Sequence, residues 1–230
     1  MHTIVLSLFV TVATVAASQD PDRMLGSPTP DFSSLKPPSM ALANREVAIY
    51  RVRAQTLPPH RYLKPVVIVW TREAIVAEQK DGGASTTREV RIGQIDLYPS
   101  GTTHSLRALK GSMHFTLIEL KQSLRSPKEL PTKPEVCGHV VEFPEGGFAC
   151  LLEMAPNQQV SIPELDVNSF SIAIDSGKVW NRVARSDPWM MRYREGQPSY
   201  NVGYEPFAIQ NLERRPLHFV LIVPPPAEYN

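Results

Sequence analysis

The sequence is poor in glycine and cysteine and has almost no net charge. Its 230 residues include 12 glycines and 2 cysteines, against 22 prolines. Proline breaks helix interiors but is tolerated at turns and strand edges, so this balance argues against a helix-rich chain. The net charge of +1, without a Lys/Arg run interleaved with aromatics, gives no support for nucleic-acid binding. The G-x-S-x-G, H-E-x-x-H, P-loop and dinucleotide fingerprints are also absent.

No apolar run reaches the roughly 18 to 20 residues that a membrane-spanning helix requires. The uncharged run Ile4 to Ala17 is followed by small residues at Val15-Ala-Ala-Ser18, which predicts a secretory signal peptide over residues 1–18. We therefore expect an exported protein, periplasmic or extracellular, with no stable transmembrane span after cleavage. The segment before the run lacks Lys and Arg, and an uncleaved apolar anchor is the alternative.

Two cysteines, Cys137 and Cys150, would then lie in an oxidising compartment where a disulfide is allowed. The turn-like stretch Pro144-Glu-Gly-Gly147 predicts a hairpin whose register places Cys150 opposite Val141. A bridge to Cys137 requires the chain before Gly138 to fold back. The sequence does not decide between a disulfide and two free cysteines. The spacing of the pair matches no zinc pattern.

The rest of the chain predicts an all-β fold. After a Pro/Ser-rich arm over residues 19–44, short apolar or alternating segments recur between Gly- or Pro-bearing turns, which is typical of a sandwich or barrel. We expect a first domain over residues 45–121, a proline-containing linker over 122–136, a second domain over 137–223 and a tail over 224–230. No helix longer than three turns is predicted.

The two halves resemble each other. Arg91-Ile-Gly-Gln94 matches Arg194-Glu-Gly-Gln197, and Val66–Val69 matches Phe170–Ala173 at almost the same offset. A period of just over a hundred residues predicts two similar domains packed together.

The stretch from Gly93 to His104 carries the most specific signal. It has the form G-x5-P-x-G-x2-H, in which a Pro/Gly turn is followed by a histidine at the start of a strand. This order resembles the second motif of the cupin superfamily, although Ala108 stands where the family often has Asn. The resemblance implies two tandem cupin-like jelly-roll β-barrels, a bicupin.

The same resemblance implies candidate metal ligands in the first barrel. The first cupin motif usually supplies H-x-H and a downstream Glu; here His60 matches the first histidine, Tyr62 occupies the second, and the carboxylate position falls near Val66. His60 and His104 are thus the expected ligands, with Tyr62 or His114 as possible completions. One divalent transition metal is implied, or none if the histidines are remnants of an ancestral site.

The second copy has no equivalent ligands. The region matching His60 is Ile162-Pro-Glu-Leu165, and the position of His104 falls on Pro206. We expect this barrel to be free of metal and to serve packing or partner contact. Its aromatic residues and two neighbouring methionines either form a barrel core or line a pocket for a ring-shaped or sugar ligand. They are Trp180, Trp189, Met190, Met191, Tyr193, Tyr200 and Tyr204.

Two functions follow from these features. The favoured one is an exported, non-catalytic cupin protein that binds a small molecule or an envelope protein, with a homodimer as a further option. The alternative is a metal-dependent cupin enzyme of the dioxygenase or isomerase type, with one degenerate site in the first barrel. Asp96 and Glu119, which flank the His104 strand, are weaker candidates for an acid or base.

Overall fold

The protein consists of β-strands throughout the part of the chain that the structure, a computed structural model, describes. This part comprises residues 32, 39–44, 46–121, 135–144, 146–163, 168–183, 186–201 and 206–224. No α-helix occurs in these ranges, and none of their segments is a helix that could cross a membrane. The expected signal peptide and most of the arm, the linker and the tail lie outside the described residues.

The N-terminal half forms two antiparallel sheets with the strand orders β1-β2-β9-β4-β7 and β3-β8-β5-β6. The five-stranded sheet contains β1 (Met40–Ala43), β2 (Val47–Ala54), β4 (Val66–Trp70), β7 (Ile95–Tyr98) and β9 (Met113–Leu120). The four-stranded sheet contains β3 (Thr56–Arg61), β5 (Ala74–Lys80), β6 (Thr86–Val90) and β8 (Thr103–Lys110).

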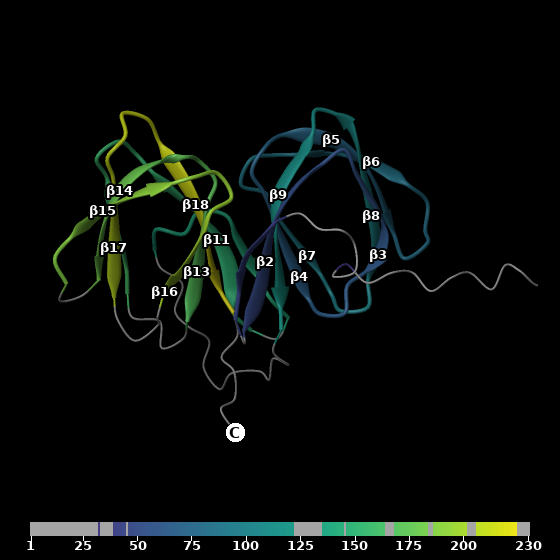
Figure 1. Ribbon diagram of the computed structural model, residues 1–230, viewed down its shortest axis with the longest axis horizontal. Helices are drawn as coiled ribbons and strands as arrows, with labels where there is room; N and C mark the ends of the chain where they lie inside the picture. Colours follow the sequence, from purple (N-terminus) through teal and green to yellow (C-terminus); the bar gives the residue numbers. More distant parts are fainter. Residues whose placement is uncertain are drawn as a thin grey trace, which may run out of the picture.

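The C-terminal half repeats this plan with the orders β10-β11-β18-β13-β16 and β12-β17-β14-β15. Its five-stranded sheet contains β10 (Val140–Glu142), β11 (Phe148–Met154), β13 (Ser169–Ala173), β16 (Pro198–Asn201) and β18 (Leu217–Val223). Its four-stranded sheet contains β12 (Gln159–Ile162), β14 (Gly177–Val183), β15 (Trp189–Tyr193) and β17 (Phe207–Asn211). Figure 1 shows the two jelly-roll barrels side by side, which confirms the predicted fold class.

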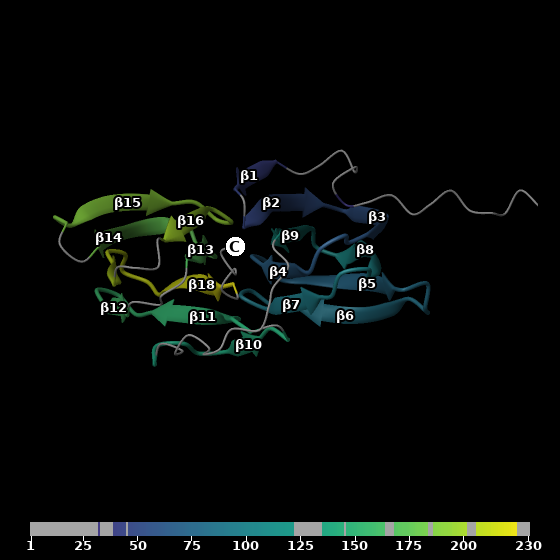
Figure 2. The same cartoon turned by 90° about the horizontal axis from the view of Figure 1, so that it is seen from below.

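The two barrels pack against each other through their five-stranded sheets. In β4, Val66 and Ile68 face the core of the first barrel, whereas Val67 and Val69 belong to an apolar cluster that Phe170 of β13 shares. This explains why β4 is apolar at every position: both of its faces are covered. Figure 2 shows the same sheets meeting at the centre of the molecule. Each fully buried Val or Phe side chain contributes about 1.5–3 kcal/mol, so this cluster holds the barrels together.

One turn occurs at the same place in both barrels. Gly93 and Gly196 have φ angles of +77° and +71°, which glycine adopts without penalty. Their amides donate to the carbonyl oxygens of Trp70 and Ala173, each at 2.8 Å. In both copies the next residue is a glutamine whose side chain accepts from an arginine amide three residues earlier, at 3.1 and 3.0 Å. The predicted internal repeat is therefore present in the structure.

The strand pairing corrects two of the expected equivalences by one residue. Because Trp70 corresponds to Ala173, the segment Val66–Trp70 matches Ser169–Ala173. The position of His104 is taken by Phe207 and not by Pro206, since both residues occupy the same register between their neighbouring strands.

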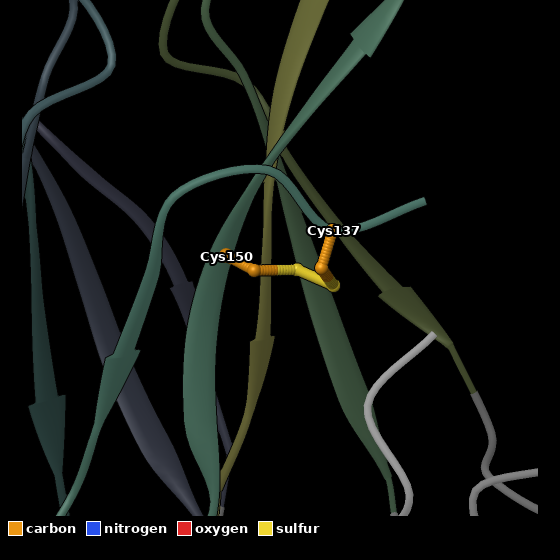
Figure 3. The surroundings of a disulfide bond; sticks show 2 residues. All are labelled: Cys137 and Cys150. Carbon is orange, nitrogen blue, oxygen red and sulfur yellow. A yellow bond between two sulfur atoms is a disulfide. The ribbon is translucent and has the colours of Figure 1, made fainter. Parts of the chain in front are cut away.

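A disulfide joins Cys137 to Cys150 in the second barrel (Figure 3), with a Cα–Cα distance of 5.5 Å. The predicted hairpin exists, but its register differs by one: Cys150 pairs with Val140, and Val141 pairs with Ala149. The chain before β10 does fold back, because the Gly138 amide donates to the carbonyl of Leu151 on β11 at 2.9 Å. That reversal brings Cys137 within reach of Cys150.

Candidate functional site

The structure brings together three of the four residues that the sequence nominated as metal ligands. β3 and β8 are adjacent, and their register pairs His60 directly with His104. Tyr62 follows β3 and is fixed to the turn before β8 by two backbone hydrogen bonds, to Thr102 at 3.0 Å and from Gly101 at 2.7 Å. All three side chains are buried, with ring centres 5.7 Å apart for the histidines and 5.6 Å for Tyr62 and His104.

His60 is held in one tautomer and keeps one nitrogen without a partner. Its Nδ1 lies 2.7 Å from the carbonyl oxygen of Pro58 and donates to it, whereas the buried Nε2 has no hydrogen-bond partner. Phe32, from the segment before the barrel, packs edge-on against the imidazole with ring centres 5.3 Å apart. Burial lowers the pKa of His60 to about 4, and the bond to Pro58 offsets only part of this effect. His60 is therefore neutral at pH 7.

His104 uses both ring nitrogens. Its Nε2 lies 2.8 Å from Oε1 of Glu78 and its Nδ1 lies 2.9 Å from the Tyr62 hydroxyl. An ionised carboxylate only accepts, so Nε2–H donates to Glu78, and in the neutral ring Nδ1 accepts from Tyr62. Burial and the nearby charge of Glu78 raise the pKa of Tyr62 well above its ordinary value, which keeps this hydroxyl a donor.

Glu78 on β5 is a member of the site that the sequence argument missed. Burial by itself would raise its pKa, but hydrogen bonds from His104 and Tyr98 and the charges of Arg88 and Lys80 outweigh burial and lower the pKa to about 2. One signal could have found it: the sequence Asp81-Gly-Gly83 is typical of a hairpin turn, which needs a strand before it as well as after it. On such a strand Ala74, Val76 and Glu78 share the inward face, as the burial of β5 shows.

The ion pairs around Glu78 extend outward to Asp96. The Nε of Arg88 lies 2.6 Å from Oε2 of Glu78, an ion pair without good hydrogen-bond alignment. The same guanidinium reaches Oδ2 of Asp96 at 2.7 Å, where the Trp70 indole N–H also donates at 2.7 Å. Asp96 is thus a structural counter-ion of Arg88. The other suggested acid, Glu119, contacts Tyr50 at 3.5 Å and no member of the histidine cluster.

His114 does not belong to this cluster. Its neighbours on β9, Met113 and Phe115, face the core of the first barrel, so His114 faces the other way. Its Nδ1 lies 3.3 Å from Oε1 of Glu195 in the second barrel. The structure does not bring His114 to the other three candidates, because alternation along the strand turns it toward the inter-barrel contact.

The described side chains of the first barrel do not fit a three-ligand metal centre. Among the described residues, no group of three His, Cys, Asp or Glu side chains is arranged to hold a metal ion. His104 has both nitrogens engaged, and Glu78 is already neutralised by Arg88. The lone pair on Nε2 of His60 is the open ligand atom of this cluster, whereas a metal site normally takes three protein ligands.

At the corresponding place, the second barrel has a cavity of about 250 Å³. The strand register puts Phe207 where the first barrel has His104, and Asn181 where it has Glu78. The arginine that pairs with Glu78 is replaced by Met191. Uncharged side chains thus occupy three positions of the charged network, although Arg182 also borders the cavity.

Five of the seven aromatic and methionine residues that the sequence suggested border one of two hollows, and Met190 borders neither. Four of them line the 250 Å³ cavity: Trp189, Met191, Tyr193 and Tyr200. Trp180 instead borders an adjoining outer hollow of about 360 Å³ with Pro188 and Gln210, and Arg182 and Ala208 line both hollows. Tyr204 lies outside the described residues. Tyr193 also belongs to the hydrophobic core of the second barrel, and Met191 packs against that core.

Asn181 supplies an unsatisfied polar group to this cavity. Its side chain is buried, and its Nδ2 has no hydrogen bond of good geometry. Burial raises the pKa of the neighbouring Tyr193, and interactions with Ser199 and Asn181 partly oppose that rise, so the three polar groups lie close together. An aromatic lining with a few convergent polar groups is typical of small-molecule sites.

Comparison with known proteins identifies the fold. No protein-family model and no curated protein matches the sequence. Among solved structures, the Bacillus subtilis oxalate decarboxylase studied for its Mn(II) centres matches with a TM-score of 0.58 and 15% identity, over 81% of this chain and 71% of that chain. The same enzyme at pH 4.6 has a TM-score of 0.55 and 18% identity, over 79% and 68%.

An oxalate decarboxylase from Lactobacillus farciminis in complex with formate also matches, with a TM-score of 0.58 and 13% identity, over 80% of this chain and 78% of that chain. Oxalate decarboxylases are bicupins. Identities this low establish a common fold and not a common activity. The protein is therefore a bicupin in fold, as the stretch from Gly93 to His104 predicted.

Proposed function

We propose that the protein is a non-catalytic, small-molecule-binding bicupin whose ligand occupies the cavity of the second barrel. The observation that supports this is the buried Nδ2 of Asn181, which makes no hydrogen bond of good geometry to a described residue and lies beside an aromatic-lined space. Buried polar groups in proteins are nearly always hydrogen-bonded. A ligand with an acceptor atom facing Asn181 would satisfy this group.

The lining indicates the class of ligand. The described residues around the cavity include no carboxylate and one cation, Arg182, and rings such as Trp189 and Phe207 form part of its walls. Its volume of about 250 Å³ is just below the roughly 300–1,000 Å³ of drug-sized sites. An uncharged single-ring molecule, aromatic or sugar, fits this combination of stacking surface and amide.

Calorimetric titration of the full chain with phenol and with D-glucose tests this proposal. The parent and Trp180→Phe, which alters the adjoining outer hollow, should bind at least one probe saturably. Asn181→Leu has a similar volume without the amide, and it should weaken binding by about tenfold, as expected for a lost buried hydrogen bond. Absence of binding to the parent, or equal binding by Asn181→Leu, would contradict the proposal.

A metal-dependent enzyme is the second candidate, and the comparisons favour it over a non-catalytic protein. All of the structures described above are oxalate decarboxylases, and one was studied for its Mn(II) centres. In this chain His60 and His104, with Tyr62 or Glu78, would have to supply the ligands. His60 supports this candidate, because metal-binding histidines commonly donate their other N–H to a carbonyl. The pairing of Glu78 with Arg88 opposes it.

Elemental analysis separates the two candidates. The parent and His104→Ala are supplied in turn with Fe, Mn, Ni, Zn and Cu, and bound metal is measured after removal of the excess. About one metal per chain in the parent and none in the variant, together with selective turnover that His104→Ala abolishes, would replace the non-catalytic proposal. Oxalate is the first substrate to assay. No bound metal in either protein would remove the enzymatic candidate.

Export of the mature protein also remains a proposal. The Cys137–Cys150 bridge supports it, since structural disulfides persist mainly in oxidising compartments. An envelope protein or a second copy of the chain would then be a possible partner. Light scattering of the purified protein addresses self-association.

A further inference from the structure

A cavity of about 570 Å³ lies at the junction of the two barrels, outside both barrel interiors. On β2, Val47 and Ile49 face the inter-barrel cluster, and Arg51 and Arg53 continue the same strand face beyond it. The strip that holds the barrels together therefore turns from apolar to cationic at this end. The lining consists of Ser39, Arg51, Arg53, Ser176, Arg194 and Glu195.

Arg194 reaches the cavity from the second barrel because the turn after β15 approaches β2 closely. A Cβ atom at Gly196 would lie 3.2 Å from Cδ of Arg51, so glycine permits this approach. Figure 2 shows the end of β15 beside β2. Three arginines from two separate strand ends thus surround one space.

The described residues do not neutralise the positive charge of this cavity. In the described part of the chain, the guanidinium groups of Arg51, Arg53 and Arg194 form no ion pair, and the buried Nε of Arg51 has no hydrogen-bond partner. The one carboxylate in the lining, Glu195, is engaged by Arg72 at 2.9 Å and by Thr71 at 3.1 Å. Burial tends to raise the pKa of Glu195, but these partners outweigh it and lower the pKa.

The fold itself does not require three arginines here. The barrels contact each other reciprocally: a Cβ atom at Gly93 would meet Leu151 of β11 at 2.9 Å, just as Gly196 meets the equivalent Arg51 of β2. At that reciprocal junction, the positions of Arg51 and Arg53 hold Leu151 and Glu153. The same backbone arrangement therefore forms without the concentration of positive charge.

We propose that this junction cavity binds a small multivalent oxyanion that carries carboxylate or phosphate groups. Guanidinium forks match such groups bidentately, and the hydroxyls of Ser39 and Ser176 supply further donors. The volume of about 570 Å³ is within the range of small-molecule sites. This site does not depend on the function proposed for the second-barrel cavity, from which it is separate.

Calorimetric titration of the full chain with citrate and with pyrophosphate, at matched ionic strength, tests the proposal and distinguishes the two kinds of anion. We expect saturable binding of at least one of them, with acetate much weaker. Arg51→Gln and Arg194→Gln should each weaken it by about tenfold or more, because a charge-assisted hydrogen bond is lost. Arg91→Gln is the matched control, since Arg91 is the repeat equivalent of Arg194 at the reciprocal junction, and it should bind like the parent.

Urea midpoints of all variants establish that each is folded. If Arg51→Gln does not fold, Arg53→Gln replaces it in the titration, because Arg53 is at an exposed position. Asn181→Leu should leave citrate and pyrophosphate binding unchanged, so that failure of either site is recognised independently. The proposal is overturned if the parent binds neither anion, or if Arg91→Gln weakens binding as much as Arg194→Gln does.

Discussion

Acidification should destabilise this protein through one buried imidazole, that of His60. The ring is inaccessible to solvent, its Nε2 has no partner, and Phe32 and Tyr62 pack around it. Protonation in the folded state would place a cation there without a counter-ion. In the unfolded chain the same ring is protonated with its ordinary pKa of about 6.5.

The size of the effect follows from the two pKa values. Because burial lowers the folded pKa to about 4, the unfolded state takes up the proton first as the pH falls. The neutral ring's contribution is thus fully present above about pH 6.5 and is lost as the pH falls toward 4. At 1.36 kcal/mol per pKa unit the loss is about 3 kcal/mol. This is a large part of the roughly 5–15 kcal/mol that stabilises a typical domain.

Urea unfolding of the parent and of His60→Gln, followed by tryptophan fluorescence at about pH 7 and pH 4, measures this loss. Protonation of Glu78, whose pKa is about 2, also lowers the free energy of unfolding below about pH 4.5. This loss occurs in both proteins and therefore cancels in the comparison. Any pH-independent cost of the substitution cancels as well. We expect the parent to lose about 3 kcal/mol more than the variant. Equal losses in the two proteins would refute the reasoning.

Three other substitutions probe the fold. Gly101→Val should lower the free energy of unfolding by about 1–2 kcal/mol, because Gly101 has a φ of +89° that a β-branched residue resists; an unchanged melting temperature would argue against this turn. Replacing Cys137 and Cys150 by serine removes a bridge with a sequence separation of 13 and should lower the free energy of unfolding in urea by about 3 kcal/mol. An unchanged free energy of unfolding after reduction of the parent would contradict that figure. Phe170→Ala should lower the free energy of unfolding by about 3–5 kcal/mol, since the ring belongs to the inter-barrel cluster. A loss below about 1 kcal/mol, as at an exposed site, would place Phe170 outside the cluster.

Much of this fold could be read from the sequence because its signals are local. The turn after Tyr98 is specified by Pro99 and Gly101, and the apolar run Val66–Trp70 is short enough to be only a buried strand. His60 and His104 were nominated together because each matches a histidine of the cupin motifs, and the structure pairs them on adjacent strands.

The remaining features depend on which strands become neighbours, and the sequence predicted them poorly. His114 was nominated as a ligand, but the direction of a strand face is decided by what covers it, and here the second barrel covers it. The sequence left the Cys137–Cys150 bridge undecided, because a one-residue change of register decides which side chains face each other.

The sequence by itself determined the all-β class, the duplication, the position of the Gly93–His104 motif and the loss of ligand histidines in the second copy, because each is a matter of residue type at fixed spacing. Only the tertiary structure decided that Glu78 joins His104, that Asn181 borders the cavity of the second barrel, and that Arg51 and Arg194 meet at the junction. These residues are far apart in the chain or on different sheets. Their proximity results from strand order and from the packing of two sheets, which no local pattern encodes.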